Sequence, residues 1–162
     1  MEKRISITLG GQSYNLAQLD LGQLRDHPRV TLRGAVANTV PLYDQHRVFI
    51  APTRFAAGTP YKVHEAASFG LPVVATEMLR MQLGWESGRD LLAADSRDPI
   101  LFAQHVLALY ADEQLWHTIR SGAAERIRSE HQPERYASAL RAVLDPTAPL
   151  PPSNVVKLRE EV

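Results

Sequence analysis

The feature that most constrains this chain is a strand, loop, helix and strand pattern over residues 48–76. Two short apolar runs, residues 48–51 and 72–75, flank a segment of helical spacing that begins near Thr59 and ends at Gly70. This order predicts a βαβ unit with parallel strands. Open parallel sheets bind ligands at the carboxyl ends of their strands. We therefore expect a ligand site in the loop that follows the first of these strands.

The predicted helix is marked at both ends. Thr59 is expected to be the N-cap, because its hydroxyl can accept a hydrogen bond from the first turn. Pro60 suits the first helical position, where its missing N–H costs nothing. Gly70 is expected to end the helix in a left-handed conformation, and Pro72 prevents its continuation.

Helical spacing divides the residues of this helix between two faces. The first face is apolar and small enough for close packing on a sheet: Val63, Ala66 and Ala67. The second face is formed by Lys62, Glu65 and Phe69. We expect the first face to hold the helix and the second to be available to a ligand.

The loop before the helix carries groups that suit an anion. Arg54 and Lys62 supply positive charge, and Gly58 lets the backbone approach a ligand closely. A helix N-terminus presents unpaired N–H groups that attract phosphate. The backbone candidates are Gly58, Thr59, Tyr61 and Lys62. A phosphate site at this junction is the first functional hypothesis.

These residues resemble the donor-binding motif of retaining GT-B glycosyltransferases (glycosyltransferase group 1, family 4 type). The family pattern reads roughly P-S-x-x-E-G-x-G-x-x-x-x-E-A-x-A-x-G-x-P-V-V-A. The positions that follow it are Pro52, Gly58, Glu65, Ala66, Ala67, Gly70, Pro72, Val73, Val74 and Ala75. The resemblance covers residues 30–144 and implies the C-terminal, donor-binding half of a GT-B fold, an α/β Rossmann-like parallel sheet flanked by helices.

The resemblance also implies roles for individual residues. Glu65 matches the second glutamate of the family's E-x7-E motif, which holds the ribose hydroxyls of the nucleotide. Gly58 and Thr59 match the backbone that meets the distal phosphate and the sugar. Base recognition is expected from the backbone around Gly34 and Val36, after an earlier strand. Together these positions describe a nucleotide-sugar site.

One position departs from the family pattern. Ala57 stands where the first glutamate of the motif normally contacts the transferred sugar. Either Arg54 or a backbone group substitutes for it, or the site is degenerate. Arg54 and Lys62 are the only candidates for a catalytic role, and neither is certain.

Simpler interpretations of the same residues stay open. Glu65 could pair with Lys62 on a solvated helix face, since exposed ion pairs are common and weak. Arg54 could be a loop cation without a ligand, and Gly58 a turn glycine. Residues 34–36 could form an ordinary turn between strand and helix.

Composition excludes several classes of protein. The chain has 162 residues, with 18 basic and 18 acidic side chains and a formal net charge of +0. The length suits one domain, and balanced charge argues against a nucleic-acid binder. The absence of cysteine excludes disulfides and zinc-thiolate sites. No apolar run is long enough for a transmembrane helix.

Along the whole chain, strand and helix patterns alternate, which predicts a parallel sheet with helices on both faces. The expected strands are residues 4–9, 30–34, 48–51, 72–75 and 90–93. The expected helices are residues 16–26, 40–45, 60–69, 99–110, 113–128 and 133–144, and residues 77–83 are expected to form a short helix or loop. We assign residues 1–144 to a nucleotide-sugar-binding domain and the proline-rich residues 145–162 to a linker or tail.

Other motifs fail on inspection. His64 and Glu65 begin the pattern of a zinc protease helix, but Ser68 stands where the second histidine must be. The remaining histidines lack ligand spacing. Trp85 and Trp116 are expected to pack or cap, with base stacking by Trp85 as the alternative.

The resemblance implies an enzyme that transfers a sugar from a UDP- or GDP-sugar to a hydroxyl acceptor with retention, without a required metal. It implies that the N-terminal acceptor domain and the first βα unit of the donor domain are missing, so that the isolated chain is inactive. A cytoplasmic location is expected because the absence of cysteine fits a reducing compartment, and family habit adds membrane association of the full-length protein as an open alternative. The alternative is a degenerate transferase-like domain that serves as a binding or scaffolding module.

Overall fold

The computed structural model describes residues 7–10, 26–55 and 58–144. The chain divides into two compact units, Met1–Gln45 and His46–Val162. All but the last residue of the expected helix over residues 16–26, and the whole tail over residues 145–162, lie outside the described ranges. The assignment of one domain to residues 1–144 therefore stays a prediction.

The first unit contains a pair of parallel strands and a short helix. β1 (Ile7–Gly10) pairs with β2 (Val30–Gly34), with a register shift after the third residue of β1. α1 (Val40–Gln45) begins where the side-chain oxygen of Asn38 accepts a hydrogen bond from the backbone N–H of Val40 at 3.0 Å. β2 and α1 have the expected bounds, and β1 ends one residue later than expected.

The second unit is built on a three-stranded parallel sheet in the order β3-β4-β5. The strands are β3 (Phe49–Ala51), β4 (Val73–Thr76) and β5 (Leu92–Ala94). β4 is central, and all four of its residues are buried. A strand covered on both faces reads as a continuous apolar run, which is why Val73, Val74 and Ala75 gave a clear signal. β4 and β5 each extend one residue beyond the expected end.

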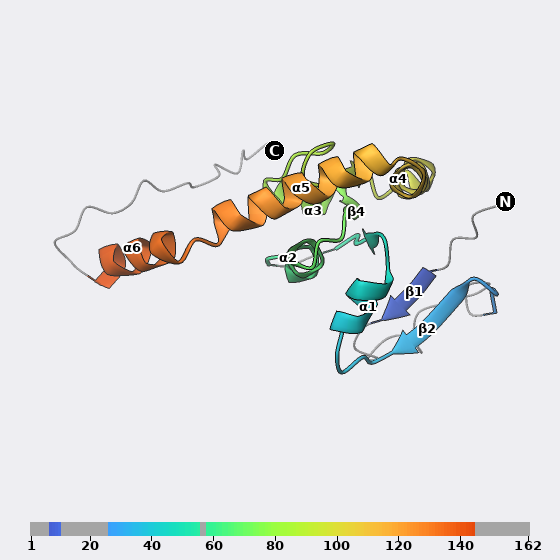
Figure 1. The fold of residues 1–162 in the computed structure, drawn as a ribbon, viewed down its shortest axis with the longest axis horizontal. Coiled ribbons are helices and arrows are strands. Elements are labelled where there is room, and N and C mark those ends of the chain that lie inside the picture. The colour runs from blue at the N-terminus through green and yellow to red at the C-terminus, as the bar shows by residue number, and fades with distance from the viewer. Residues whose placement is uncertain (1–6, 11–25, 56–57, 145–162) are drawn as a thin grey trace, which may run out of the picture. The chain divides into compact units, whose positions relative to one another are not determined.

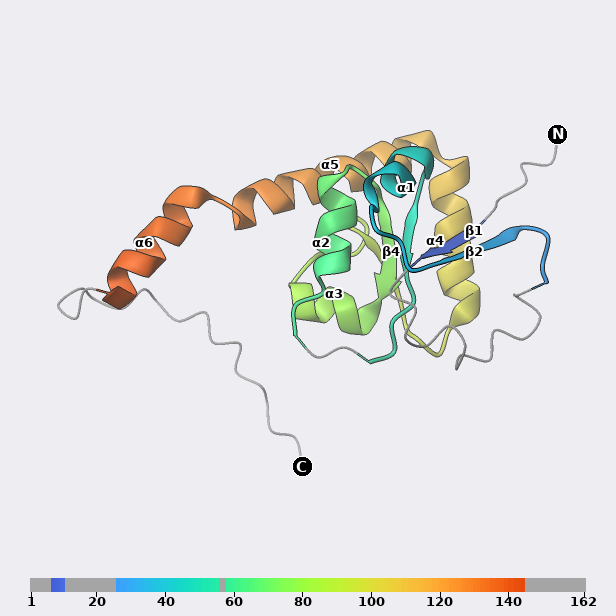
Figure 2. The same ribbon diagram turned by 90° about the horizontal axis from the view of Figure 1, so that it is seen from below.

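Helices α2 (Tyr61–Ser68) and α3 (Glu77–Leu83) provide the two crossovers of this sheet. α4 (Pro99–Ala111) covers the other face, so that β4 lies between α4 and the pair α2 and α3 (Figure 2). α5 (Glu113–Glu130) then runs past α4 and α2, and α6 (Pro133–Leu144) continues beyond a bend (Figure 1). The expected parallel sheet flanked by helices is confirmed.

Aspartate caps explain where α4 and α5 begin. The Asp98 carboxylate accepts a hydrogen bond from the Leu101 N–H, and the Asp112 carboxylate accepts one from the Leu115 N–H, both at 2.9 Å. Such caps satisfy backbone donors that have no partner inside the helix. These caps fix the first residues of α4 and α5, and a single residue, Asp112, separates the two helices.

The core of the second unit lies between β4, β5 and the paired helices α4 and α5. Its buried cluster is formed by Val74, Leu92, Leu109 and Ile119. Phe102, Val106 and Leu115 pack against the cluster. Trp85 is 1% exposed, which supports packing and excludes base stacking by its ring.

The two ends of α2 differ in how well the sequence predicted them. Thr59 as N-cap and Pro60 as first helical residue are wrong: Pro60 is the N-cap, with ψ 68°, and no side chain caps the helix. The Tyr61 N–H instead donates to the Thr59 carbonyl at 2.9 Å, so the chain enters through a tight backbone turn. At the other end, Gly70 has φ +77°, so its expected left-handed conformation is confirmed.

Candidate functional site

Hydrogen bonds join the carboxyl ends of β3 and β4 to the first turn of α2. The Thr76 hydroxyl donates to the Thr53 carbonyl at 2.8 Å. The Lys62 ammonium donates to the Thr53 hydroxyl. Thr53 lies two residues after the end of β3, so these bonds hold the start of the loop in place. The edge of the sheet predicted to bind a ligand is therefore an organised junction of three elements.

The loop itself presents its predicted residues to solvent. Arg54, Gly58 and Thr59 are exposed. Gly58 has φ +85°, and a Cβ added there would meet no atom within 4 Å. The positive φ, rather than a lack of space for a side chain, therefore favours glycine at position 58. Ala57 lies outside the described residues.

Lys62 is electrostatically distinct within this junction. Desolvation by the surrounding protein lowers the pKa of Lys62 from its ordinary value, although part of the side chain is exposed. Burial disfavours the charged form of an amine. An anion bound beside the Lys62 ammonium would offset this penalty. The ammonium lies near the end of β3, where it can supply positive charge to such an anion.

Glu65 lies one helical turn further along and is exposed. It lines an open hollow of about 480 Å³ between α2 and α5, together with Tyr61, His64, Ser68, Ile127 and His131. The carboxylate therefore faces a crevice rather than a dry interior. Its expected partner, a ribose, remains a prediction, and so does the alternative of a simple surface ion pair.

Two charged residues outside the predicted site follow strands β4 and β5. Glu77, directly after β4, accepts a hydrogen bond from the Arg80 guanidinium at 2.6 Å. Asp95, directly after β5, accepts hydrogen bonds from Arg97. The Arg97 hydrogen bonds and charge hold the pKa of Asp95 well below its usual range. The only feature of the sequence that could have indicated Glu77 and Asp95 is their position shortly after predicted strands.

Gly34 and Val36, the candidates for base recognition, belong to the first unit. Gly34 ends β2, and Val36 follows within the turn that leads toward α1. Val36 is half-buried. The predicted role of their backbone stays a prediction, as does the alternative of an ordinary turn.

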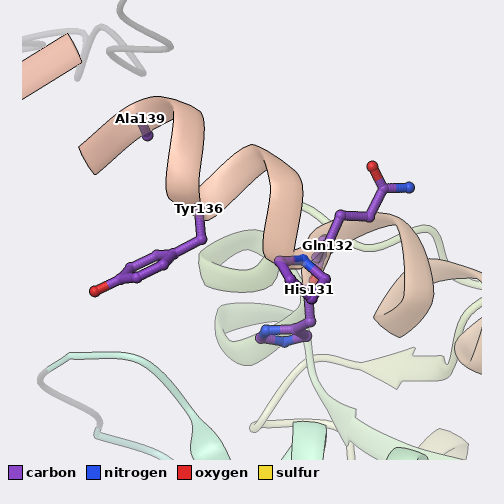
Figure 3. A pocket seen from close by; sticks show the side chains of 6 residues that line it. His131, Gln132, Tyr136 and Ala139 are labelled. Atoms are coloured by element: carbon purple, nitrogen blue, oxygen red, sulfur yellow. The ribbon is translucent and has the colours of Figure 1, made fainter. Parts of the chain in front are cut away.

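A second hollow, of about 560 Å³, lies at the bend between α5 and α6. Figure 3 shows Tyr136 and the ring of His131 beside this bend. Its lining residues are Glu130, His131, Gln132, Pro133, Tyr136 and Ala139. None of them is a predicted donor-site residue, but His131 lines both this hollow and the one beside Glu65.

The chain matches the family described as "Glycosyl transferases group 1" over residues 2–112, and it belongs to this family. No curated protein sequence matches it significantly.

Solved structures share the fold at low sequence identity. Sucrose-phosphate synthase from Thermosynechococcus elongatus is 20% identical with a TM-score of 0.66, covering 85% of this chain and 37% of that one. HepE from Anabaena, solved with UDP-glucose, is 20% identical with a TM-score of 0.65, covering 85% and 40%. The pneumococcal O-GlcNAc transferase GtfA, solved with UDP and GlcNAc, is 19% identical with a TM-score of 0.61, covering 86% and 29%.

These comparisons identify the fold as the C-terminal portion of a GT-B glycosyltransferase, as the motif over residues 52–75 predicted. The chain spans between 29% and 40% of the length of these three structures. Within the described part of the chain, no helix has the length and apolar character needed to cross a membrane.

Proposed function

We propose that this chain is the donor-binding half of a retaining glycosyltransferase that moves a sugar from a UDP- or GDP-sugar to a hydroxyl acceptor. The observation that carries the proposal is an exposed carboxylate on the helix whose first turn lies at the carboxyl edge of the parallel sheet. Glu65 supplies that carboxylate, and Lys62 ties the turn to Thr53. Membership of the glycosyl transferase group 1 family supports this interpretation.

In the proposed reaction, the acceptor oxygen forms a bond to the anomeric carbon while the bond from that carbon to the distal phosphate oxygen breaks. Solvent water takes up the proton of the acceptor hydroxyl, and the nucleoside diphosphate leaves with added negative charge. Pre-oriented cations and N–H groups stabilise such charge best. Arg54, Lys62 and the backbone at the start of α2 are the groups of this chain that we propose for this role. The scheme requires no metal.

The remaining roles follow the order of groups in a nucleotide sugar. Glu65 would hold the ribose hydroxyls, and the backbone of Gly58 and Thr59 would meet the distal phosphate. Backbone groups around Gly34 and Val36 would recognise the base. HepE and GtfA are solved with UDP-glucose and with UDP and GlcNAc, which supports a UDP-sugar as the donor.

Turnover by the whole protein would need an acceptor-binding half. The chain spans 37% of sucrose-phosphate synthase and 40% of HepE, which supports this requirement. We therefore expect the isolated chain to bind the donor without transferring sugar. The complete enzyme is proposed to act in the cytoplasm, beside a membrane if its acceptor is lipid-linked.

Calorimetry with UDP, GDP and their glucose and mannose conjugates tests the proposal. We expect binding of one nucleotide class, and a loss of affinity of about 10-fold or more in Glu65→Ala, because hydrogen bonds to a charged group contribute about 1.5–3 kcal/mol. Glu134→Ala is the matched control, since Glu134 is an exposed glutamate on α6. Equal affinity of Glu65→Ala and Glu134→Ala would contradict the role of Glu65.

Ala57 supports a second candidate, a degenerate transferase domain that acts as a binding or scaffolding module. The same titrations separate the two functions. A folded chain with no response to any nucleotide favours the second, and full-length protein should then be titrated as well, because upstream residues could complete the site.

A further inference from the structure

We propose that His64, Glu130 and His131 bind a divalent cation, with zinc preferred, and that this cation fastens α2 to the C-terminal end of α5. His64 is far in sequence from the adjacent residues Glu130 and His131, and all three lie within the second unit. The site would be structural and would line the same hollow as Glu65, but its test uses zinc alone and so does not depend on the proposed transferase function.

The spacing of the ligand atoms suits a small cation. His64 Nε2 lies 3.4 Å from Glu130 Oε2. One ligand atom from each of the three residues lies within 4.8 Å of the others. Two ligands bound tetrahedrally to zinc at about 2.0–2.2 Å are separated by roughly 3.3–3.6 Å. His64 and Glu130 thus have the required spacing, and exposed His131 needs only a small side-chain movement to join them.

The chemistry of the ligand set favours zinc over harder cations. Two imidazoles and one carboxylate form a set that binds zinc in proteins, with a fourth position left for water. Magnesium and calcium prefer oxygen ligands. The hollow of about 480 Å³ that His64 and His131 line leaves room for that water.

Neighbouring side chains hold Glu130 in place. The Trp85 indole N–H donates to the Glu130 carboxylate, at 3.3 Å to each oxygen. Arg126 lies 2.7 Å from Glu130 Oε1, whereas His64 faces Oε2. A cation would therefore bind through Oε2 alone. Contacts from residues that do not themselves bind the metal, such as Trp85 and Arg126, orient metal-binding carboxylates.

His64 itself is largely removed from solvent, with its side chain 16% exposed. Its ring meets the rings of Trp85 and His131 edge-on, with centroids 5.4 Å apart in both cases. Among the described residues, none forms a hydrogen bond with the buried Nδ1 atom of His64. The cation would bind Nε2, the atom that faces Glu130, and Nδ1 is not one of the proposed ligand atoms.

The chain offers a matched control on the same helix. His117 Nε2 lies 3.7 Å from Glu113 Oε1, four residues apart on α5. This pair is not part of a three-residue ligand group among the described residues. If an ordinary histidine–glutamate contact were sufficient for zinc binding, the control pair would contribute as much as the proposed site.

The test uses the tag-free chain, stripped of metal and titrated with zinc chloride by calorimetry and thermal melting. We expect one zinc per chain and a rise in Tm of about 5 °C at a tenfold excess over Kd, since a bound ion stabilises only the folded state. Magnesium chloride should give no rise. His131→Ala and Glu130→Gln should each weaken zinc binding about tenfold or more, and His117→Ala should not.

His131→Ala is the decisive variant, because the side chain is exposed and its loss should not unfold the chain. Its urea midpoint without zinc checks this directly. The proposal is overturned if the parent chain shows no zinc-dependent rise in Tm. It is also overturned if His131→Ala binds zinc as tightly as the parent, or if His117→Ala loses as much affinity as His131→Ala.

Discussion

The two faces of α2 come from the same short segment but differ in role: one packs in the interior and the other is open to solvent. Val63, Ala66 and Ala67 are at most 2% exposed and hold the helix against its neighbours. Lys62 and Glu65 lie on the open face, beside the end of the sheet and the hollow next to α5. The packed face sets where the helix lies, so the open face can carry charged groups without contributing much to stability.

This division has a physical basis. Burial of apolar surface is non-directional and tolerates few polar groups, whereas recognition of a ligand needs polar groups with solvent access. A helix of eight residues can meet both demands only by separating them around its axis. Substitutions on the two faces should therefore separate stability from binding.

The largest effect is expected from Ala66→Leu on the packed face. Ala66 is 0% exposed, so the added methylenes must displace neighbouring strands or side chains. We expect a loss of about 3 kcal/mol in the free energy of unfolding, measured by urea denaturation.

Ser68→Leu is the control, because it adds a leucine to an exposed position of the same helix. Its effect should stay within about 0.5 kcal/mol. Equal losses from both variants would show that the helix as a whole, rather than one face, is sensitive to size.

A smaller loss is expected at the C-terminal end of α2. Gly70→Ala places a Cβ at a position with φ +77° and about 3.1 Å from Arg120 Nε. The left-handed conformation costs a residue with a Cβ about 1–2 kcal/mol. Urea denaturation measures the stability of Gly70→Ala and Gly70→Asn. Gly70→Asn should lose less stability than Gly70→Ala, because asparagine tolerates the left-handed conformation. A neutral Gly70→Ala would contradict the conformational argument.

The smallest effect on stability is expected from Lys62→Met on the open face. The folded-state pKa of Lys62 is lowered, so the unfolded chain binds more protons between that pKa and the ordinary value. The stability contributed by Lys62 therefore rises with pH through this window and is lowest below it. Lys62→Met should abolish this rise.

Urea denaturation of the parent and Lys62→Met at neutral and alkaline pH measures the difference. Lys62→Met should be as stable as the parent or slightly more so at neutral pH, while its affinity for a nucleoside diphosphate falls. A clear loss of stability at neutral pH would mean that the bond to Thr53 outweighs the desolvation of the amine.

Most elements of the fold could be predicted because their signals are local. Val73, Val74 and Ala75 form a continuous apolar run, and Gly70 marks the helix end before it. The start of α2 could not be read in the same way. Threonine and proline, the residue types at positions 59 and 60, suit several cap geometries. The backbone turn at Thr59 and Tyr61 determines which of these geometries is formed.

The candidate site was predicted as a set of residue types, not as an arrangement. The motif selected Gly58 and Glu65, and positive charge selected Arg54 and Lys62. Neither indicated the bonds that place Lys62 against Thr53 and Thr53 against Thr76. Those bonds depend on the register of β3 beside β4, which residue spacing alone does not give.

By itself the sequence determined the alternation of strands and helices, because the periodicity of apolar residues and the conformation of glycine act over a few neighbouring positions. The family was indicated by the resemblance of the motif over residues 52–75. Only the tertiary structure decided which distant side chains meet. His64 and Glu130 are brought together when α5 packs on α2, and no local pattern encodes that contact. Long-range packing, rather than sequence spacing, therefore created the cluster proposed to bind zinc.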